Sequence, residues 1–337
     1  NVGYIRIVSF SEKTTSMTQE AIKKLIKQIG QDKIQGLVLD LRNNPGGLLD
    51  QAVGVCDLFL ESGEIVSTRS RKPEDTMRFS ATKGDETNGL PLVVLINEGS
   101  ASASEIVAGA IQDNDRGYVV GRRSFGKGLV QRILPMFDGS ELRLTIARYY
   151  TPSGRNIQKP YDGGTDKYFH DIESRYKNGE LINPDSVQFP DSLKYFTRTK
   201  HRTVYGGGGI FPDIFVPLDT NKITTLYRQI FNKGALNRGV KSYINNHRKQ
   251  MLRKNPDFAS YNAARPDIQP MLQSILEIAK EEQIEYTNEQ LDEIMDILTL
   301  QIHALTAQSL YGNEYFYHII YPLNDAITST LKIINKE

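Results

Sequence analysis

The chain has 337 residues, of which 39% are hydrophobic and 24% are charged, and its formal net charge is +1. This balance is ordinary for a globular protein and implies no bulk electrostatic attraction to nucleic acid or to an anionic membrane. The single cysteine, Cys56, excludes an internal disulfide and lies in an apolar run typical of a buried side chain. No apolar run approaches the roughly 20 residues that span a bilayer.

The first 150 residues alternate between strand patterns and helix patterns. Apolar runs bounded by turn residues predict strands at 3–10, 36–41, about 63–69, about 76–81, 91–96 and 117–121, and a hairpin around 138–140. Apolar residues at helical spacing predict helices at about 22–29, 48–60 and 102–113. Strands that alternate with helices in this way predict the α/β class.

The character of the sequence changes after this alternation. Residues 152–219 are rich in loop-forming residues and include a glycine run, Gly206–Gly209. From about residue 221, apolar positions recur at helical spacing to the end of the chain. Because the length favours two units, we predict a core at 1–219, loop-rich over 152–219, followed by an α-helical region at 220–337.

The segment Gly99–Glu105 lies between a predicted buried strand and a predicted helix, and it carries Ser102 in its middle. A strand holds a nucleophile rigidly, and a helix N-terminus offers free N–H groups and a positive dipole end to an oxyanion. A Ser-capped helix that packs closely through small residues would produce the same pattern without any chemistry. The segment alone does not decide between these interpretations.

The segment Ser124–Gln131 places Lys127 between two glycines in an otherwise apolar stretch. Solvation at the surface explains this placement poorly. An ammonium group that loses hydration releases its proton more readily, so a desolvated Lys127 can act as a general base. A plain Gly-Lys-Gly turn between two strands is the alternative interpretation.

Other chemistries find less support in the sequence. Residues 121–127 fit the start of a P-loop, but the next residue is Gly128 rather than Ser or Thr, and a strand pattern follows instead of a helix pattern. None of the five histidines lies in an apolar strand–turn–helix context, although a Ser–His–Asp triad can form through distant residues. No metal-ligand spacing such as H-E-x-x-H occurs, so we predict no metal site.

Six motifs follow one another along residues 1–219, apart from an unmatched stretch near 160–204. They are GYIRI, LDLRNNPGG, NEGSASASE, GRRSFGKGLVQ, YYTPSGRNIQ and GIFPDIFVP. Together and in this order they resemble the core of the carboxy-terminal processing (tail-specific) peptidases, a family of serine–lysine proteases. The resemblance implies a ClpP/crotonase-like spiral core within the α/β class.

The resemblance also implies roles for individual residues. In that family the middle serine of Ser-Ala-Ser-Ala-Ser is the nucleophile and the lysine of Phe-Gly-Lys-Gly is the base, which here are Ser102 and Lys127. A glutamine four residues after the lysine completes the set, and here it is Gln131. On a continuous strand, Gln131 would share a face with Lys127 and could orient its amine.

The implied activity is that of a serine endopeptidase that cleaves protein or peptide substrates near their C-terminal tails through an acyl-enzyme, with no cofactor and no nucleic acid partner. Its oxyanion hole would combine the Ala103 amide with the amide of Gly46 or Gly47, and the sequence leaves open which glycine. The helical region would serve packing or the formation of a homo-oligomer. Family members act mostly outside the bacterial cytoplasm, so the periplasm or cell envelope is the expected location.

The family usually carries a PDZ domain, which captures a peptide carboxylate, just before the GYIRI strand. In this chain that strand begins at the first residues, so we expect weak or poorly tail-selective cleavage. Two alternatives from other classes are a catalytically silent peptide-binding module and a crotonase-like acyl-CoA enzyme. The intact set of Ser102, Lys127 and Gln131 argues against the first, and the lack of a CoA-related signature argues less strongly against the second.

Overall fold

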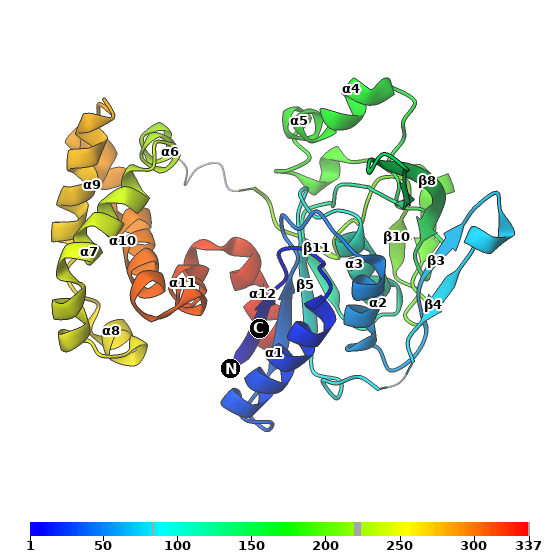
Figure 1. The fold of residues 1–337 in the computed structure, drawn as a ribbon, viewed down its shortest axis with the longest axis horizontal. Helices are drawn as coiled ribbons and strands as arrows, with labels where there is room; N and C mark the ends of the chain where they lie inside the picture. The colour runs from blue at the N-terminus through cyan, green and yellow to red at the C-terminus, as the bar shows by residue number, and fades with distance from the viewer. Residues whose placement is uncertain (83, 219–223, 336–337) are drawn as a thin grey trace. The chain divides into compact units, whose positions relative to one another are not determined.

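The computed structural model describes residues 1–82, 84–218 and 224–335. The contacts within the chain divide it into two compact units, one of Asn1–Leu218 with Ser329–Glu337 and one of Asp219–Thr328. Each unit has its own cluster of buried apolar side chains. Figure 1 shows the helices and strands from which each unit is built.

A parallel five-stranded sheet organises the first unit, in the order β1-β2-β5-β6-β11. Figure 1 labels its strands β5 and β11. Its strands are β1 (Val2–Arg6), β2 (Gly36–Asp40), β5 (Leu92–Ile96), β6 (Tyr118–Gly121) and β11 (Ile214–Phe215). Every residue of β2 and of β5 is buried, as expected for central parallel strands that are covered on both faces. β2 and β5 pair in parallel with Leu37 opposite Leu92. The strands predicted at 36–41, 91–96 and 117–121 are confirmed, the one predicted at 3–10 ends at Arg6, and β11 lies in the region predicted to be loop-rich.

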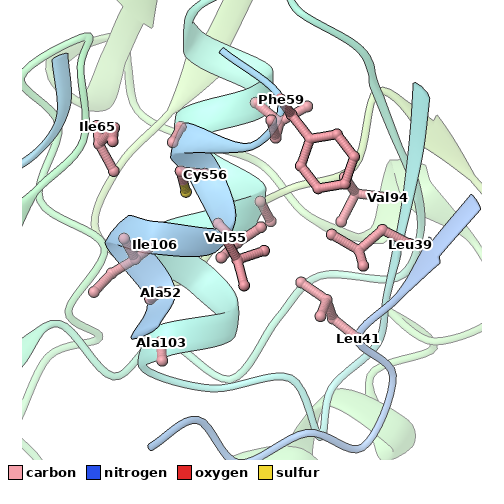
Figure 2. Close-up of a cluster of buried hydrophobic side chains, with 14 of the residues drawn as sticks. Leu39, Leu41, Ala52, Val55, Cys56, Phe59, Ile65, Val94, Ala103 and Ile106 are labelled. Carbon is pink, nitrogen blue, oxygen red and sulfur yellow. The ribbon is translucent and has the colours of Figure 1, made fainter. Parts of the chain in front are cut away.

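Three helices connect strands of this unit, namely α1 (Thr14–Ile29), α2 (Leu49–Asp57) and α3 (Ala103–Asp113). Every residue of α3 is buried. Val55 and Cys56 of α2 share one core with Ile106 of α3 and with Leu39 and Val94 of the sheet (Figure 2). Cys56 is fully buried in this core, as predicted, and burial raises the pKa of its thiol.

A four-stranded antiparallel sheet, in the order β4-β3-β8-β7, also belongs to the first unit. Its strands are β3 (Glu64–Arg69), β4 (Arg78–Ser80), β7 (Leu129–Pro135) and β8 (Glu141–Tyr150). β7 and β8 form the predicted hairpin, and β7 lies at the edge of the sheet. The register of this pair shifts between Val130 and Gln131, and residues 131–145 are exposed.

The stretch near 160–204, within the region predicted to be loop-rich, contains short regular elements. They are α4 (Gly164–Phe169), α5 (Asp171–Lys177), the 3-10 turns η2 (Pro184–Ser186) and η3 (Asp191–Leu193), and the antiparallel pair β9 (Lys194–Phe196) and β10 (Thr203–Tyr205). Another 3-10 turn, η1 (Pro73–Asp75), precedes β4. Elements of three to seven residues are too short to produce a recognisable apolar period in the sequence.

The second unit is helical, as predicted for this part of the chain. Its helices are α6 (Thr225–Asn232), α7 (Ala235–Lys254), α8 (Phe258–Ala264), α9 (Gln269–Glu281), α10 (Asn288–Tyr311) and α11 (Asn313–Ile320), followed by η4 (Tyr321–Leu323). The last helix, α12 (Asp325–Asn335), begins in this unit, and its residues from Ser329 on belong to the first unit. α7 packs on α9 and α10 around the fully buried side chains of Ile244, Ile275 and Leu298. Among the described residues, no helix is both long enough and apolar enough to cross a membrane.

Candidate active site

Three segments leave neighbouring strands of the parallel sheet at the same edge, since the carboxyl ends of adjacent parallel strands coincide. These segments are 41–47 after β2, 97–102 after β5 and 122–128 after β6. Backbone hydrogen bonds join them. The Ala101 N–H donates to the Asn44 carbonyl (3.0 Å), and the Phe125 N–H donates to the Ser100 carbonyl (2.9 Å). The segments that carry Gly46, Ser102 and Lys127 are therefore brought together.

Ser102 is the N-cap residue of α3 and ends the segment that leaves β5. Its backbone has φ 56° and ψ −113°, which is uncommon and costly for a residue with a β-carbon. The Ser102 N–H donates to Oε2 of Glu105 (2.9 Å), and the Ser102 carbonyl accepts from the Glu105 N–H (2.9 Å). The predicted strand–turn–helix context is confirmed, and a strained serine at such a turn is a recurrent arrangement for a nucleophile.

The three serines of this turn have different environments. Ser100 and Ser104 are fully buried, and their hydroxyls donate to the carbonyls of Leu41 (2.8 Å) and Asn44 (3.0 Å) respectively. Ser102 is half-buried, and among the described residues no acceptor takes a hydrogen bond from its hydroxyl. The two flanking serines therefore fasten the turn, and the middle serine keeps its hydroxyl proton available.

The Gly46–Gly47 turn lies against the start of α3. A β-carbon on Gly46 would come within 2.8 Å of Ser102 Cβ and 2.9 Å of Ala103 N, so the close approach requires glycine, which also tolerates φ 101°. The Gly46 N–H donates to Oδ1 of Asn44 (2.9 Å). Within the described part of the chain, the N–H groups of Gly47 and Ala103 have no acceptor. Each of these two segments thus offers one unused amide, and the close approach of Gly46 brings the two segments together.

Lys127 lies between β6 and β7 and is half-buried. Its backbone N–H donates to Oε2 of Glu105 (2.8 Å), the same oxygen that accepts from the Ser102 N–H. A β-carbon on Gly128 would come within 2.8 Å of Gln158 N, and Gly126 has φ 89°. The flanking glycines therefore serve tight packing and an unusual backbone conformation on either side of the lysine.

Glu105 is a site residue that the sequence analysis did not single out. Its fully buried carboxylate accepts from the Ser102 and Lys127 amides on Oε2, and from Ser124 Oγ (2.5 Å) and the Gly126 amide (2.7 Å) on Oε1. Burial raises the pKa of Glu105, and the hydrogen bonds that it accepts oppose this rise. One carboxylate thus ties the serine turn to the lysine segment. The signal that could have revealed it is the capping box that Ser102 and Glu105 form.

Arg175, from the stretch that matched no motif, also holds the lysine segment. It lies in α5, is 2% exposed, and donates to the carbonyls of Ser124 (2.7 Å) and Phe125 (3.2 Å). Asp171 pairs with the same guanidinium at 2.8 Å. Arg175 therefore fixes the residues just before Gly126 and Lys127, and a part of the chain without a recognised motif supports the site.

The positions of Lys127 and Gln131 do not match the strand geometry expected for them. Lys127 precedes β7, which begins at Leu129, so Lys127 and Gln131 do not lie on one continuous strand. The register shift between Val130 and Gln131 places its extra residue, Ile146, in β8. Gln131 is also exposed. The strand assumed for the spacing of four residues therefore does not include Lys127, and the case for Gln131 depends on the motif.

The structure tests the P-loop interpretation and shows the environment of one of the five histidines. A strand, β7, follows Lys127 instead of the helix that a P-loop requires, so the P-loop interpretation fails. His303, in the second unit, is buried and bonded to the Tyr261 hydroxyl (2.9 Å), and burial lowers its pKa to about 4. Within the described residues, no group of three or more His, Cys, Asp or Glu side chains is placed to hold a metal ion.

Residues 1–167 match the family described as peptidase family S41, and residues 226–312 match a family of unknown function (DUF8443). A carboxy-terminal-processing protease of Bartonella bacilliformis is 60% identical over 158 residues, which are 47% of this chain and 36% of that protein. A chloroplastic C-terminal processing peptidase of Tetradesmus obliquus is 42% identical over 158 residues, which are 47% of this chain and 33% of that protein. The match thus spans about a third of the length of these relatives.

Among solved structures, the photosystem II D1 C-terminal processing protease is similar, with 41% sequence identity and a TM-score of 0.42. This match covers 47% of this chain and 39% of that one. The S41 match and the observed elements confirm the expected fold class, an α/β core followed by an α-helical region.

Proposed function

Residues 1–167 belong to the serine-type peptidases of family S41 and to their carboxy-terminal processing group, and on this premise we propose that Ser102 is the nucleophile and Lys127 the general base of peptide-bond hydrolysis. The observation that carries the proposal is the Glu105 carboxylate, which accepts from the backbone amides of both residues. A buried carboxylate shared in this way fixes the distance between the two backbones, as a nucleophile and its base require.

In the proposed reaction, the neutral amine of Lys127 takes the proton of the Ser102 hydroxyl while the serine oxygen attacks the peptide carbonyl carbon. The resulting ammonium gives that proton to the leaving amine, the C–N bond breaks, and the acyl group remains on Ser102 as an ester. Lys127 then deprotonates a water molecule, which attacks the ester and releases the new C-terminal carboxylate. The serine recovers its proton from the lysine.

We assign the oxyanion hole to the amides of Ala103 and Gly47. The Ala103 N–H is the first of α3, where the free N–H groups and the dipole of the helix stabilise negative charge. Gly47 is preferred to Gly46 because the Gly46 N–H already donates to Asn44. The role of Gly46 is then the close approach to Ala103, which a side chain would prevent.

Two further residues have proposed supporting roles. Glu105 is a positioning residue, since it acts through the backbones of Ser102 and Lys127 and touches no reacting atom. Gln131 keeps the role that the family motif gives it, which is to orient the Lys127 amine. Because Gln131 is exposed, this role would require its side chain to turn toward the amine when substrate binds.

The proposed substrates are proteins or peptides cleaved near their C-terminal tails, in line with the names of the relatives. We also propose an extracytoplasmic location, such as the periplasm or cell envelope, and a homo-oligomer formed through the helical unit. Fractionation of cells that produce the protein tests the location, and sedimentation equilibrium of the full chain tests the oligomer.

Incubation with an unfolded protein, followed by mass spectrometry of the products, tests the hydrolase proposal. New peptide termini should appear with the unmodified chain and be absent with Ser102→Ala. A fluorophosphonate probe should label Ser102 in the unmodified chain and label Lys127→Ala far more slowly. If the folded, unmodified chain binds the substrate and leaves it intact, the silent peptide-binding module becomes the better interpretation.

A further inference from the structure

A cleft of about 960 Å³ lies along the antiparallel sheet of the first unit. The end of β3 with the residues that follow it, parts of β7 and β8, and Tyr161 form its walls. Leu129, the first residue of β7, lines the cleft and is separated from Lys127 by a single glycine. The cleft therefore begins beside the segment that carries the proposed general base.

Positive charge is concentrated in this cleft. All of its charged lining residues are cationic and exposed, and they are Arg69, Arg71, Lys72, Arg132 and Arg148. In the register of the sheet, Arg148 stands opposite Arg69 of β3. Like charges that face each other on neighbouring strands repel. Stacking of Arg69 on the Tyr150 ring, at 4.1 Å from the ring centroid, offsets part of this repulsion.

Two acidic side chains of this sheet and its hairpin turn have partners outside the cleft. Glu64 of β3 pairs with Arg78 of β4 (3.2 Å), and Asp138 at the hairpin turn accepts from the Ser140 hydroxyl (2.6 Å). In the described part of the chain, Arg71, Lys72 and Arg148 make no ion pair. An anion that enters the cleft would therefore meet cations that are not already satisfied by the protein.

The cleft also has features that suit a peptide chain. Apolar side chains lie between the cations, including Leu134, Leu144 and Ile146. β7 is the edge strand of its sheet, and the free backbone groups of an edge strand can pair with an extended peptide. Cationic and apolar lining residues and an open strand edge together match an extended segment with acidic side chains.

We infer that this basic cleft binds an acidic segment of the substrate, in extended form, next to the bond that Ser102 attacks. The inference rests on the proposed hydrolase function and adds a substrate class to it. Chains with Asp or Glu close to the scissile bond are cleaved in preference to chains with neutral residues there. The preference weakens with salt, because the attraction between exposed charges is screened over about 10 Å at 0.1 M ionic strength.

Matched peptides test this preference. One series carries Asp and Glu on either side of the cleaved bond, and the other carries Asn and Gln at the same positions. The unmodified chain should cleave the acidic peptide with a kcat/KM about tenfold higher at low salt, as expected for a few exposed charge pairs. The ratio should fall to about one or below in Arg148→Glu and in the double variant Arg71→Glu/Lys72→Glu.

Arg143→Glu is the matched control, since Arg143 lies on β8, is exposed, and does not line the cleft. It makes the same change of charge and should keep the ratio of the unmodified chain. Thermal unfolding shows whether each variant is folded. The two positions changed in the double variant lie outside the strands of the sheet. Equal cleavage of both peptides by the unmodified chain, or the same ratio in all variants, would overturn the inference.

A binding measurement separates this inference from the proposed function. Ser102→Ala should bind a fluorescent acidic peptide in a salt-dependent manner, and adding Arg148→Glu should weaken that binding about tenfold. If the unmodified chain cleaves no peptide while this binding is seen, the hydrolase proposal fails and the acidic-peptide cleft stands. If cleavage occurs and the binding changes neither with salt nor with Arg148→Glu, the hydrolase proposal stands and the cleft inference fails.

Discussion

The Ser102 turn and the Lys127 segment are held in place by different means. Ser102 lies between a buried strand and a helix, and its strained backbone is fixed by Glu105, three residues away. Lys127 belongs to neither a helix nor a strand, and its segment depends on Glu105 and on Arg175, which are remote in the sequence. Local structure thus contributes to the position of the nucleophile, together with the bonds of Ser100 and Ser104 to the segment after β2, whereas the position of the base depends on distant contacts.

Loss of the nucleophile should have the largest effect on activity. Ser102→Ala should reduce peptide hydrolysis to the limit of detection while the chain remains folded. Ser100→Ala and Ser104→Ala should keep most of the activity per folded molecule, but each should lose about 1–3 kcal/mol of unfolding free energy, because buried hydrogen-bond partners are left unsatisfied. Casein hydrolysis and denaturant unfolding measure the two quantities. Turnover by Ser102→Ala would show that another residue is the nucleophile.

Loss of the base should have the second-largest effect on activity. Lys127→Ala should lower kcat/KM by about 10²–10⁴-fold, the usual contribution of a general base. Lys127→Arg tests chemistry against charge, because a guanidinium keeps its proton at any working pH and cannot accept the serine proton. An Arg variant with near-normal activity would show that Lys127 acts through its charge or its packing.

Glu105→Gln should affect both segments at once. The side-chain amide places an N–H₂ group where two N–H or O–H donors converge, so at least one buried hydrogen bond is lost. We expect about 1–3 kcal/mol less unfolding free energy and a fall in kcat with little change in KM. Labelling by a fluorophosphonate should slow in parallel with kcat. Normal kcat in a destabilised variant would mean that Glu105 supports the fold without positioning the site.

The parts of the site that the sequence predicts are those set by neighbouring residues. The buried run of β5, the small residues of α3 and the glycines of the turns each carry a local pattern, and these predict the context of Ser102. The four bonds of Glu105 join residues that no periodicity connects, so only the capping box points to it.

The same distinction explains the failures of prediction. Arg175 lies on a helix of seven residues, which is too short for a period, and its partners are in another segment. The register shift at Val130 and Gln131 has no signature in the residues themselves, since several side chains tolerate such a bulge. The sheet and helices of the first unit follow from apolar patterns, whereas contacts between segments need coordinates.

Arg175→Ala should have a moderate effect on activity, because it removes support from the lysine segment but keeps the Lys127 side chain. Two carbonyls, of Ser124 and Phe125, lose their donor. We expect kcat to fall about tenfold, in line with a small displacement of a catalytic group. Lys177→Ala is the control, since Lys177 lies on the same helix and makes an exposed pair with Glu173. Equal kcat in the two variants would show that the lysine segment holds its position unaided.

The smallest expected effect is a change of unfolding free energy with pH. It tests whether desolvation or hydrogen bonding dominates at Glu105. Burial raises the pKa of its carboxyl above the value of about 4.3 expected in the unfolded chain. Between these two pKa values the folded chain binds more protons than the unfolded chain, so the contribution of Glu105 to stability is fully present at low pH and is lost as the pH rises through the folded pKa. Glutamine does not titrate, and the difference in unfolding free energy between the unmodified chain and Glu105→Gln isolates this group. That difference should shrink as the pH rises from about 4. If the difference grows with pH instead, the hydrogen bonds from the two segments outweigh desolvation. These hydrogen bonds then hold the carboxylate that joins nucleophile and base in its charged form.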